Sequence, residues 1–172
     1  TFLNVTREEL LDRVHECWAS LFTERAMEYR RRQGFDHDEV GMAVVVQRMI
    51  DADRSGVAFT RDPATGDPEM IIEAAWGLGE GVVSGSISPD TYVVTREGTP
   101  VDVTVADKKR AFRRDPDTGE TVEVDVSDDR RTARVLSEAE LADLVDLGKR
   151  VEDHYGDPQD VEWAMADGEV YL

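Results

Sequence analysis

Apolar residues recur at helical spacing in two long stretches of the chain. In Thr6–Arg32 they follow the three-to-four-residue period of an amphipathic helix. Thr6 and Glu9 form a capping-box signature at its start, and Gly34 is a natural end. The second stretch, Ser137–His154, has a capping box and a terminal glycine of the same kind. The pattern therefore predicts two main helices, one near each end of the chain.

The segments between and after these helices carry short apolar or alternating runs, which are typical of strands. Turn sequences rich in Asp, Pro and Gly (DPATGD and DPDTGE) separate several of them. The predicted strands are Gly41–Ile50, Ser55–Arg61, Glu69–Ala75, Asp90–Thr95, Val101–Lys109, Thr121–Val126, Val161–Met165 and Val170–Leu172. This order predicts an α+β fold, with a mostly antiparallel sheet and the two main helices packed on it.

Composition limits the classes of function. A chain of 172 residues with 40% hydrophobic residues suits one packed domain. The net charge of −18 argues against nucleic acid and anionic membranes as partners. No apolar run reaches the roughly 18 residues that a spanning helix needs. The single cysteine fits a reducing cytoplasm. The acidity suits either a halophilic source or an ordinary acidic protein.

Paired carboxylates near the C-terminal end are the first candidate for chemistry. Asp160 and Glu162 are two residues apart on a predicted strand, so their side chains are expected on one face, with Val161 on the other. Oxygen ligands of this kind suit Mg²⁺ that is also bound by a polyphosphate. The alternative is a pair of solvated acidic residues on a hairpin.

Three further motifs have both a functional and a structural interpretation. The glycine-rich loop Gly77–Gly85 can approach phosphate closely, or can simply need positive φ angles. Gln47–Met49 can pair with adenine through its backbone, or can be the end of a core strand. A basic cluster can attract phosphate or belong to a solvated hairpin, and it consists of Lys108, Lys109, Arg110, Arg113 and Arg114.

Taken together, these segments resemble one family. The quoted runs are SGVAFTRDPATGD, IIEAAWGLGEGVVSGSISPDTYVV and HYGDPQDVEWAMADGEVYL, with CWASLFTERAMEYR in the first helix. They are similar to the N-terminal nucleotide-binding domain of phosphoenolpyruvate synthases. The same pattern occurs in rifampin phosphotransferases and, more loosely, in pyruvate phosphate dikinases. The resemblance covers essentially all of residues 1–172.

The resemblance implies an ATP-grasp-like fold and a phosphotransferase that uses ATP and Mg²⁺. In this family a phosphoryl group passes from ATP to a histidine on a separate swivelling domain, which delivers it to pyruvate or another acceptor. By motif, Glu162 resembles the metal-binding glutamate, which also serves to bind the nucleotide, and Asp160 resembles a catalytic acidic neighbour. Thr1 resembles the last residue of a phosphate-covering loop. The adenine hinge corresponds to Gln47, Arg48 and Met49.

The resemblance also implies that residues 1–172 form the C-terminal part of this nucleotide-binding domain. The family's N-terminal lysine, upstream arginine, phosphohistidine domain and pyruvate-binding domain have no counterpart in the sequence, so we expect the fragment alone to be inactive. Its expected partners are ATP and those domains of the full-length cytoplasmic enzyme. A phosphoenolpyruvate synthase is the first interpretation and a rifampin phosphotransferase the second. A non-catalytic acidic interaction module is an alternative of another class.

Overall fold

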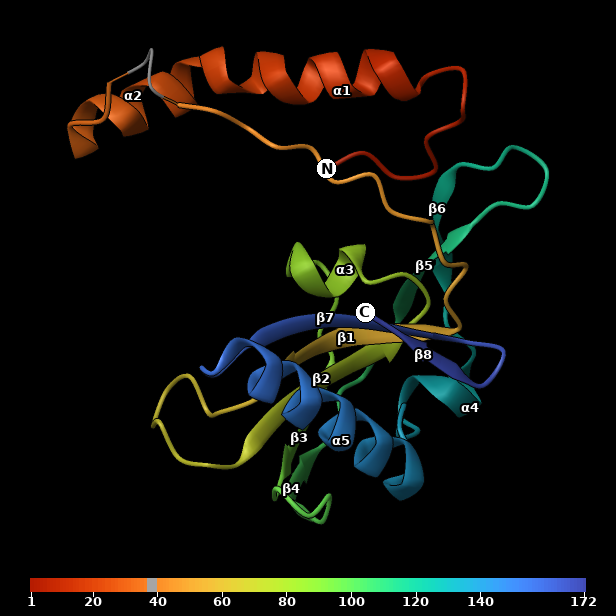
Figure 1. The fold of residues 1–172 in the computed structure, drawn as a ribbon. Helices are drawn as coiled ribbons and strands as arrows, with labels where there is room; N and C mark the ends of the chain where they lie inside the picture. The colour runs from red at the N-terminus through yellow and green to blue at the C-terminus, as the bar shows by residue number, and fades with distance from the viewer. Residues whose placement is uncertain (37–39) are drawn as a thin grey trace. The chain divides into compact units, whose positions relative to one another are not determined.

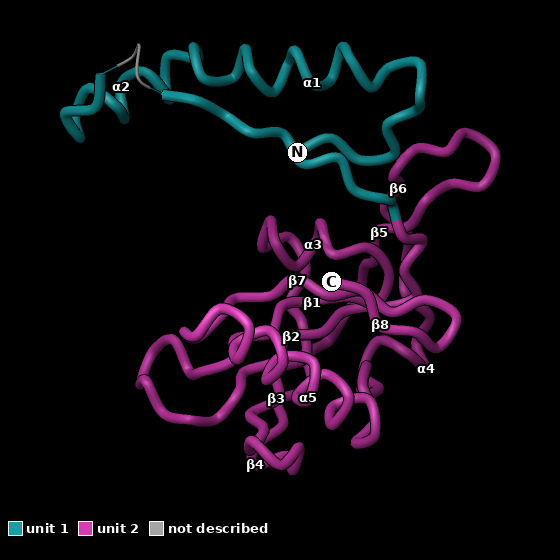
Figure 2. Tube along the Cα trace, viewed as in Figure 1, with its two compact units in different colours: residues 1–49 teal, residues 50–172 magenta. Residues whose placement is uncertain are grey.

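The computed structural model describes residues 1–36 and 40–172. The chain divides into two compact units, Thr1–Met49 and Ile50–Leu172 (Figure 2). Each unit has its own secondary structure, and the second contains all of the strands that the structure describes. None of the helices in the described part of the chain combines the length and the apolarity that crossing a membrane requires.

The first unit contains two helices where the sequence predicts one. A helix α1 (Leu10–Ala19) runs into a 3₁₀ turn η1 (Ser20–Phe22), and α2 (Glu24–Gln33) follows. The break falls at Thr23, where the backbone is extended. The Thr23 side-chain oxygen caps α2 by accepting a hydrogen bond from the Ala26 amide at 3.4 Å. A threonine that offers its hydroxyl to the backbone favours a helix start over a helix interior.

The ends predicted for this helical region agree better with the structure. Thr6 and Glu9 exchange the predicted hydrogen bonds, with the Glu9 amide donating to the Thr6 hydroxyl oxygen at 3.4 Å. Glu9 in turn accepts from the amide and hydroxyl of Thr6. Gly34 ends α2 in the left-handed conformation, with φ of 75°. The capping signals therefore predicted the end at Gly34 correctly, whereas α1 begins only at Leu10, four residues after Thr6, and the interruption at Thr23 was missed.

The predicted buried strand at Gly41–Ile50 is wrong. The segment has no strand structure in the described chain and is mostly exposed. Val45, in its middle, is 85% exposed. Valine-rich composition favours an extended backbone, but a strand also requires a neighbouring strand for its backbone hydrogen bonds. No described residue supplies that pairing here.

The second unit is built on a six-stranded antiparallel sheet (Figure 1). Its strands are ordered β4-β3-β2-β1-β7-β8. Most neighbouring pairs are hairpins, but β7 returns from the end of the chain to pair with β1. The bounds are β1 (Arg54–Phe59), β2 (Met70–Trp76), β3 (Asp90–Val94), β4 (Pro100–Thr104), β7 (Asp160–Ala166) and β8 (Glu169–Tyr171). The predicted antiparallel α+β architecture is confirmed.

One face of the sheet is covered by the long helix α5 (Glu138–Tyr155), as Figure 1 shows. Its buried positions recur at helical spacing: Leu141, Leu144, Val145 and Gly148. They pack with the inward side chains of the sheet, among them Met70, Ile72, Tyr92, Trp163 and Met165. A side chain at Gly148 would come within 2.4 Å of the Met70 methyl group, so glycine permits the close approach of helix and sheet. The predicted capping box at Ser137 and Glu140 is present.

The opposite face of the sheet is only partly covered. A short helix α3 (Glu80–Val83) contacts β1 and β2 on this side. A separate hairpin, β5 (Arg110–Arg114) with β6 (Thr121–Asp125), packs at the end of β2, with Phe112 toward α3 and Ala111 in the core beneath α5. A second small apolar cluster forms there from Ala75, Val82 and Ile87, with Val57 and Phe112 packed against it. The remaining helix, α4 (Asp128–Arg131), precedes α5. The half-exposed part of this face is where the predicted carboxylates are found.

Candidate functional site: the open face of the sheet

Asp160 and Glu162 lie on the same face of β7. Burial alternates along the strand, with Trp163 and Met165 in the core beneath α5 and both carboxylates exposed on the opposite side. Their common orientation follows from the two-residue period of a strand. The predicted geometry is therefore found, whereas the roles of the two residues as catalytic group and metal ligand stay predictions.

A third carboxylate shares this face. In the sheet register Val57 of β1 is opposite Glu162 on one side and opposite Glu73 of β2 on the other. Directly opposed residues in an antiparallel sheet point to the same face, so Glu73, Val57 and Glu162 form one row across three strands. Neighbouring strands are about 4.8 Å apart, which puts the backbones of the two glutamates roughly 10 Å apart.

Glu73 was not among the predicted site residues. The signal that could have found it is a charged residue interrupting the apolar strand MIIEAAW, in which Ile72 and Ala74 on either side are buried. A half-buried carboxylate in such a strand must face away from the core. Its partnership with Glu162, however, depends on the pairing of β1 with β7, which are about a hundred residues apart in sequence.

The two glutamates of this row and the nearby Asp160 have no positively charged partner among the described residues. In the part of the chain that the structure describes, Glu73, Asp160 and Glu162 take part in no ion pair and no side-chain hydrogen bond. Other acidic residues of the same unit do: Glu140 pairs with Arg54 at 2.8 Å and Glu152 with Arg96 at 2.8 Å. The open face thus offers free anionic oxygens.

This arrangement fits Mg²⁺ carried by a nucleotide better than a metal held by protein alone. Among the described residues, no three His, Cys, Asp or Glu side chains gather closely enough to enclose an ion. Mg²⁺ commonly keeps several waters and takes one or two protein carboxylates together with phosphate oxygens. The exposed, unpaired oxygens of Asp160 and Glu162 meet that smaller requirement.

The glycine-rich loop lies on the same face, beside the row. Ser55, which is opposite Ala164 in the register, donates its hydroxyl hydrogen to the Gly77 carbonyl at 2.6 Å. Gly77 has φ of 80°, and a side chain there would come 2.1 Å from the Phe112 carbonyl oxygen. The Leu78 amide donates to that same oxygen at 2.8 Å. At Gly77 and Leu78 the structural interpretation of the loop is therefore sufficient.

The other predicted nucleotide contacts belong to the first unit. Thr1 is exposed, and Gln47, Arg48 and Met49 are exposed in a segment without regular structure. Asp160 and Glu162 belong to the second unit. The predicted adenine hinge and the carboxylates therefore belong to different units, and a shared nucleotide site stays a prediction.

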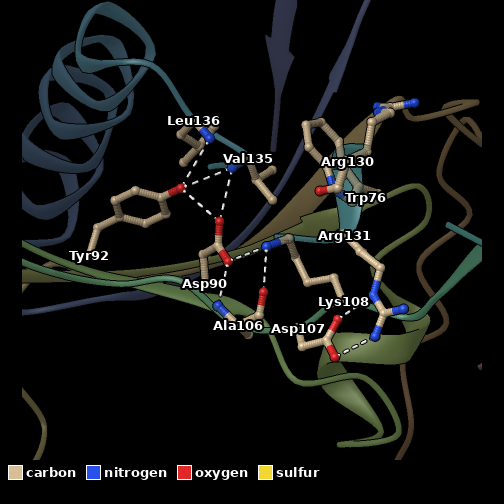
Figure 3. A network of polar contacts seen from close by, with 10 residues as sticks. All are labelled: Trp76, Asp90, Tyr92, Ala106, Asp107, Lys108, Arg130, Arg131, Val135 and Leu136. Atoms are coloured by element: carbon tan, nitrogen blue, oxygen red, sulfur yellow. Dashed lines mark hydrogen bonds and ion pairs between the residues drawn. The ribbon is translucent and has the colours of Figure 1, made fainter. Parts of the chain in front are cut away.

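The basic cluster is not a single phosphate-binding patch. Lys108 is fully buried and contacts Asp90, as Figure 3 shows. Arg110 of β5 is instead paired on the surface with Glu123 and Asp125 of β6. One lysine of the cluster thus belongs to the interior, and one arginine is neutralised by the adjacent strand.

Comparison with known proteins decides which family the fold belongs to. Residues 1–172 match the pyruvate phosphate dikinase AMP/ATP-binding domain from end to end. The chain belongs to this family. The expectation drawn from the sequence resemblance is therefore confirmed at the level of the domain, and the open face can be considered as part of an AMP/ATP-binding domain.

The relatives compared with this chain are named as two kinds of enzyme. The chain is 51% identical to a probable phosphoenolpyruvate synthase of Methanothermobacter thermautotrophicus and 47% identical to one of Archaeoglobus fulgidus. It is 48% identical to a rifampicin phosphotransferase of a Streptomyces species. All of the chain is matched each time, but it spans only 25%, 23% and 20% of those three proteins. The relatives therefore contain a large part with no counterpart in residues 1–172.

Proposed function

We propose that this chain is the ATP-binding part of a phosphoenolpyruvate synthase, in which ATP phosphorylates a histidine on a separate domain. The observation that supports this most is the match of all 172 residues to an AMP/ATP-binding domain family. The two archaeal relatives named above are probable phosphoenolpyruvate synthases. Pyruvate is the acceptor that this proposal assigns, and the products are AMP, phosphoenolpyruvate and phosphate.

In this proposal Glu162 and Asp160 bind the metal–nucleotide complex from the open face. Glu162 supplies an oxygen to Mg²⁺. Asp160, two residues earlier on the same face of β7, orients the phosphates. Bound Mg²⁺ would neutralise charge on the polyphosphate, which is most of what phosphoryl transfer requires from a protein site. Gln47, Arg48 and Met49 hold adenine, and Thr1 contributes next to the phosphates. The free carboxylates on β7 support the assignments of Glu162 and Asp160, and the other assignments rest on the sequence resemblance alone.

A rifamycin acceptor is the second candidate. It is favoured by the Streptomyces rifampicin phosphotransferase, whose 48% identity lies between those of the two archaeal proteins. The ATP-binding domain alone cannot discriminate between the acceptors, because the acceptor binds elsewhere in both proposals. Both candidates share the same use of ATP, so the residue assignments on β7 are the same for each.

An assay of the full-length protein tests the proposal. The protein is incubated with Mg·ATP and either pyruvate or rifampicin, and AMP and phosphorylated acceptor are quantified. Pyruvate-dependent formation of AMP and phosphoenolpyruvate is the expected result. Rifampicin-dependent AMP formation would assign the second candidate. Absence of ATP turnover and of nucleotide-dependent thermal stabilisation would contradict both, and would favour a non-catalytic interaction module.

A further inference from the structure

A fully buried ion pair joins the start of β3 to the segment that leads into the β5–β6 hairpin. Lys108 Nζ is 2.5 Å from Asp90 Oδ1, and both side chains are completely inaccessible (Figure 3). The Ala106 amide donates to Asp90 Oδ1 and the Val135 amide to Asp90 Oδ2, both at 2.9 Å. The Tyr92 hydroxyl donates to Asp90 Oδ2 at 3.1 Å. One carboxylate therefore joins β3 to two connecting segments.

Such a pair is poorly explained by stability alone. Removing two charges from water costs free energy that their attraction often fails to recover, and apolar residues of similar size can be as stabilising. Its better-supported use is to select one arrangement of the chain over others. Lys108 can select one arrangement of the chain, because its ammonium also donates to the Ala106 carbonyl at 3.0 Å and thereby fixes the 106–108 segment.

That segment leads directly into the hairpin. The Lys108 amide donates to the Arg131 carbonyl at 2.9 Å, and the Val126 amide closes the base of the hairpin on the Lys109 carbonyl at 2.9 Å. Asp107 adds two hydrogen bonds from the Arg131 guanidinium, each 2.5 Å long. These hydrogen bonds connect the anchor formed by Asp90 and Lys108 to the start of β5.

The hairpin in turn holds the glycine-rich loop. We call residues 77–83 the loop wall, because they border the open face. The Phe112 carbonyl accepts from Leu78, and a side chain at Gly81 would come within 2.9 Å of the Phe112 ring. Trp76, immediately before the wall, donates its indole hydrogen to the Arg130 carbonyl at 3.1 Å. The chain of contacts thus runs from the ion pair to the wall.

We propose that Asp90 and Lys108 form a positioning device, which holds the β5–β6 hairpin and, through Phe112, the loop wall beside the face that carries Glu162. This inference rests on the proposed function, since it assigns the wall to the border of the nucleotide site. Lys108 touches no substrate in this account and acts only through the position of the wall.

Hydrogen exchange of the 172-residue chain tests the positioning directly. In Lys108→Met the Leu78 amide is expected to exchange at least tenfold faster relative to the β7 amides than in the wild type. The control is Arg96→Met, which breaks a partly buried ion pair to Glu152 of α5 and touches no residue of the loop wall. In that variant the ratio of Leu78 to β7 exchange stays unchanged. If Lys108→Met gives the same ratio as the control, the pair is merely stabilising and the proposal is overturned.

Affinity for Mg·ATP separates positioning from stability. At a temperature where both variants are folded, Lys108→Met is expected to bind at least fivefold more weakly than the wild type, and Arg96→Met equally well. Faster Leu78 exchange with unchanged affinity would overturn the role of the wall. If Lys108→Met does not fold, Lys108→Gln, which removes the charge and shortens the side chain but leaves a polar amide, replaces it in both measurements. If the full-length wild type binds no Mg·ATP, the proposed function fails, while the exchange ratio still decides whether the pair positions the wall.

Discussion

Lys108 and Asp90 form a salt bridge of 2.5 Å in which neither side chain is exposed to solvent. Lysine and aspartate are rarely buried to this extent unless they are paired. Here the carboxylate also accepts two backbone amides, so it is neutralised and hydrogen-bonded at once. The pair lies 18 residues apart in sequence and joins strand β3 to the connection before β5.

Removing one partner of this pair should strongly destabilise the second unit. Asp90→Ala leaves the Lys108 ammonium buried without its counter-charge, which typically costs about 3–5 kcal/mol. Urea unfolding at neutral pH measures the loss. Arg110→Gln is the matched control, because it removes an exposed partner of Glu123 and should have little effect. Equal, small losses in the two variants would contradict the central place given to Asp90.

Tyr92 should titrate late. Burial, with the neighbouring Asp90 charge, raises the pKa of its phenol from 10.0 to about 12. The folded protein therefore retains a proton that the unfolded chain has lost, and stability falls between about pH 10 and 12. Ultraviolet titration should show one of the four tyrosines ionising about two pH units late. The late step should disappear in Tyr92→Phe, and its persistence there would assign it to another tyrosine.

The contact between Arg96 and Glu152 should make the second unit sensitive to acid. A hydrogen bond from Arg96 lowers the pKa of Glu152 below its ordinary value of 4.5 despite partial burial. A carboxyl with a depressed folded pKa stabilises the fold above its unfolded pKa, and this contribution is lost as the pH falls through the folded value. Melting temperatures measured from pH 6 downward should therefore fall less steeply below about pH 4.5 in Arg96→Met than in the wild type. Identical slopes would mean that Arg96 does not couple to this titration.

Salt should stabilise the chain. The net charge of −18 creates self-repulsion that counterions screen, with a Debye length of roughly 3 Å at 1 M. The melting temperature is expected to rise between low and multimolar KCl. A flat or falling curve would remove the argument for a halophilic source without affecting the family assignment.

Local signals in the sequence predicted much of the second unit. Turn residues and two-residue alternation identified β1, β2, β3 and β7, and capping residues identified α5. The failures have tertiary causes. Gly41–Ile50 has strand propensity without a strand neighbour, and Lys108 resembles a surface lysine until Asp90 is placed beside it. The row formed by Glu73, Val57 and Glu162 likewise depends on strand order, which alternation along one strand cannot reveal.

Glu73 and Glu162 should differ in their effects on Mg²⁺-dependent nucleotide binding. Glu162→Gln removes the proposed metal ligand and should weaken Mg·ATP binding most, whereas Glu73→Gln should produce a smaller loss from the opposite end of the row. Glu169→Gln on β8 is the control, since it removes a charge from an exposed edge strand outside that row. Manganese titration followed by electron paramagnetic resonance, with ATP present, ranks the three variants. Equal manganese affinities in Glu162→Gln, Glu73→Gln and the Glu169→Gln control would exclude both glutamates from the site.

The central claim is that the open face of β7 binds a nucleotide through a divalent metal. Calorimetric titration of ATP into the 172-residue chain, with and without Mg²⁺ and in wild type and Glu162→Gln, tests it most directly. The account predicts binding that requires Mg²⁺ and that weakens at least tenfold in Glu162→Gln, or by about 1.4 kcal/mol. ATP binding that is equally tight without metal, or unchanged in Glu162→Gln, would contradict it.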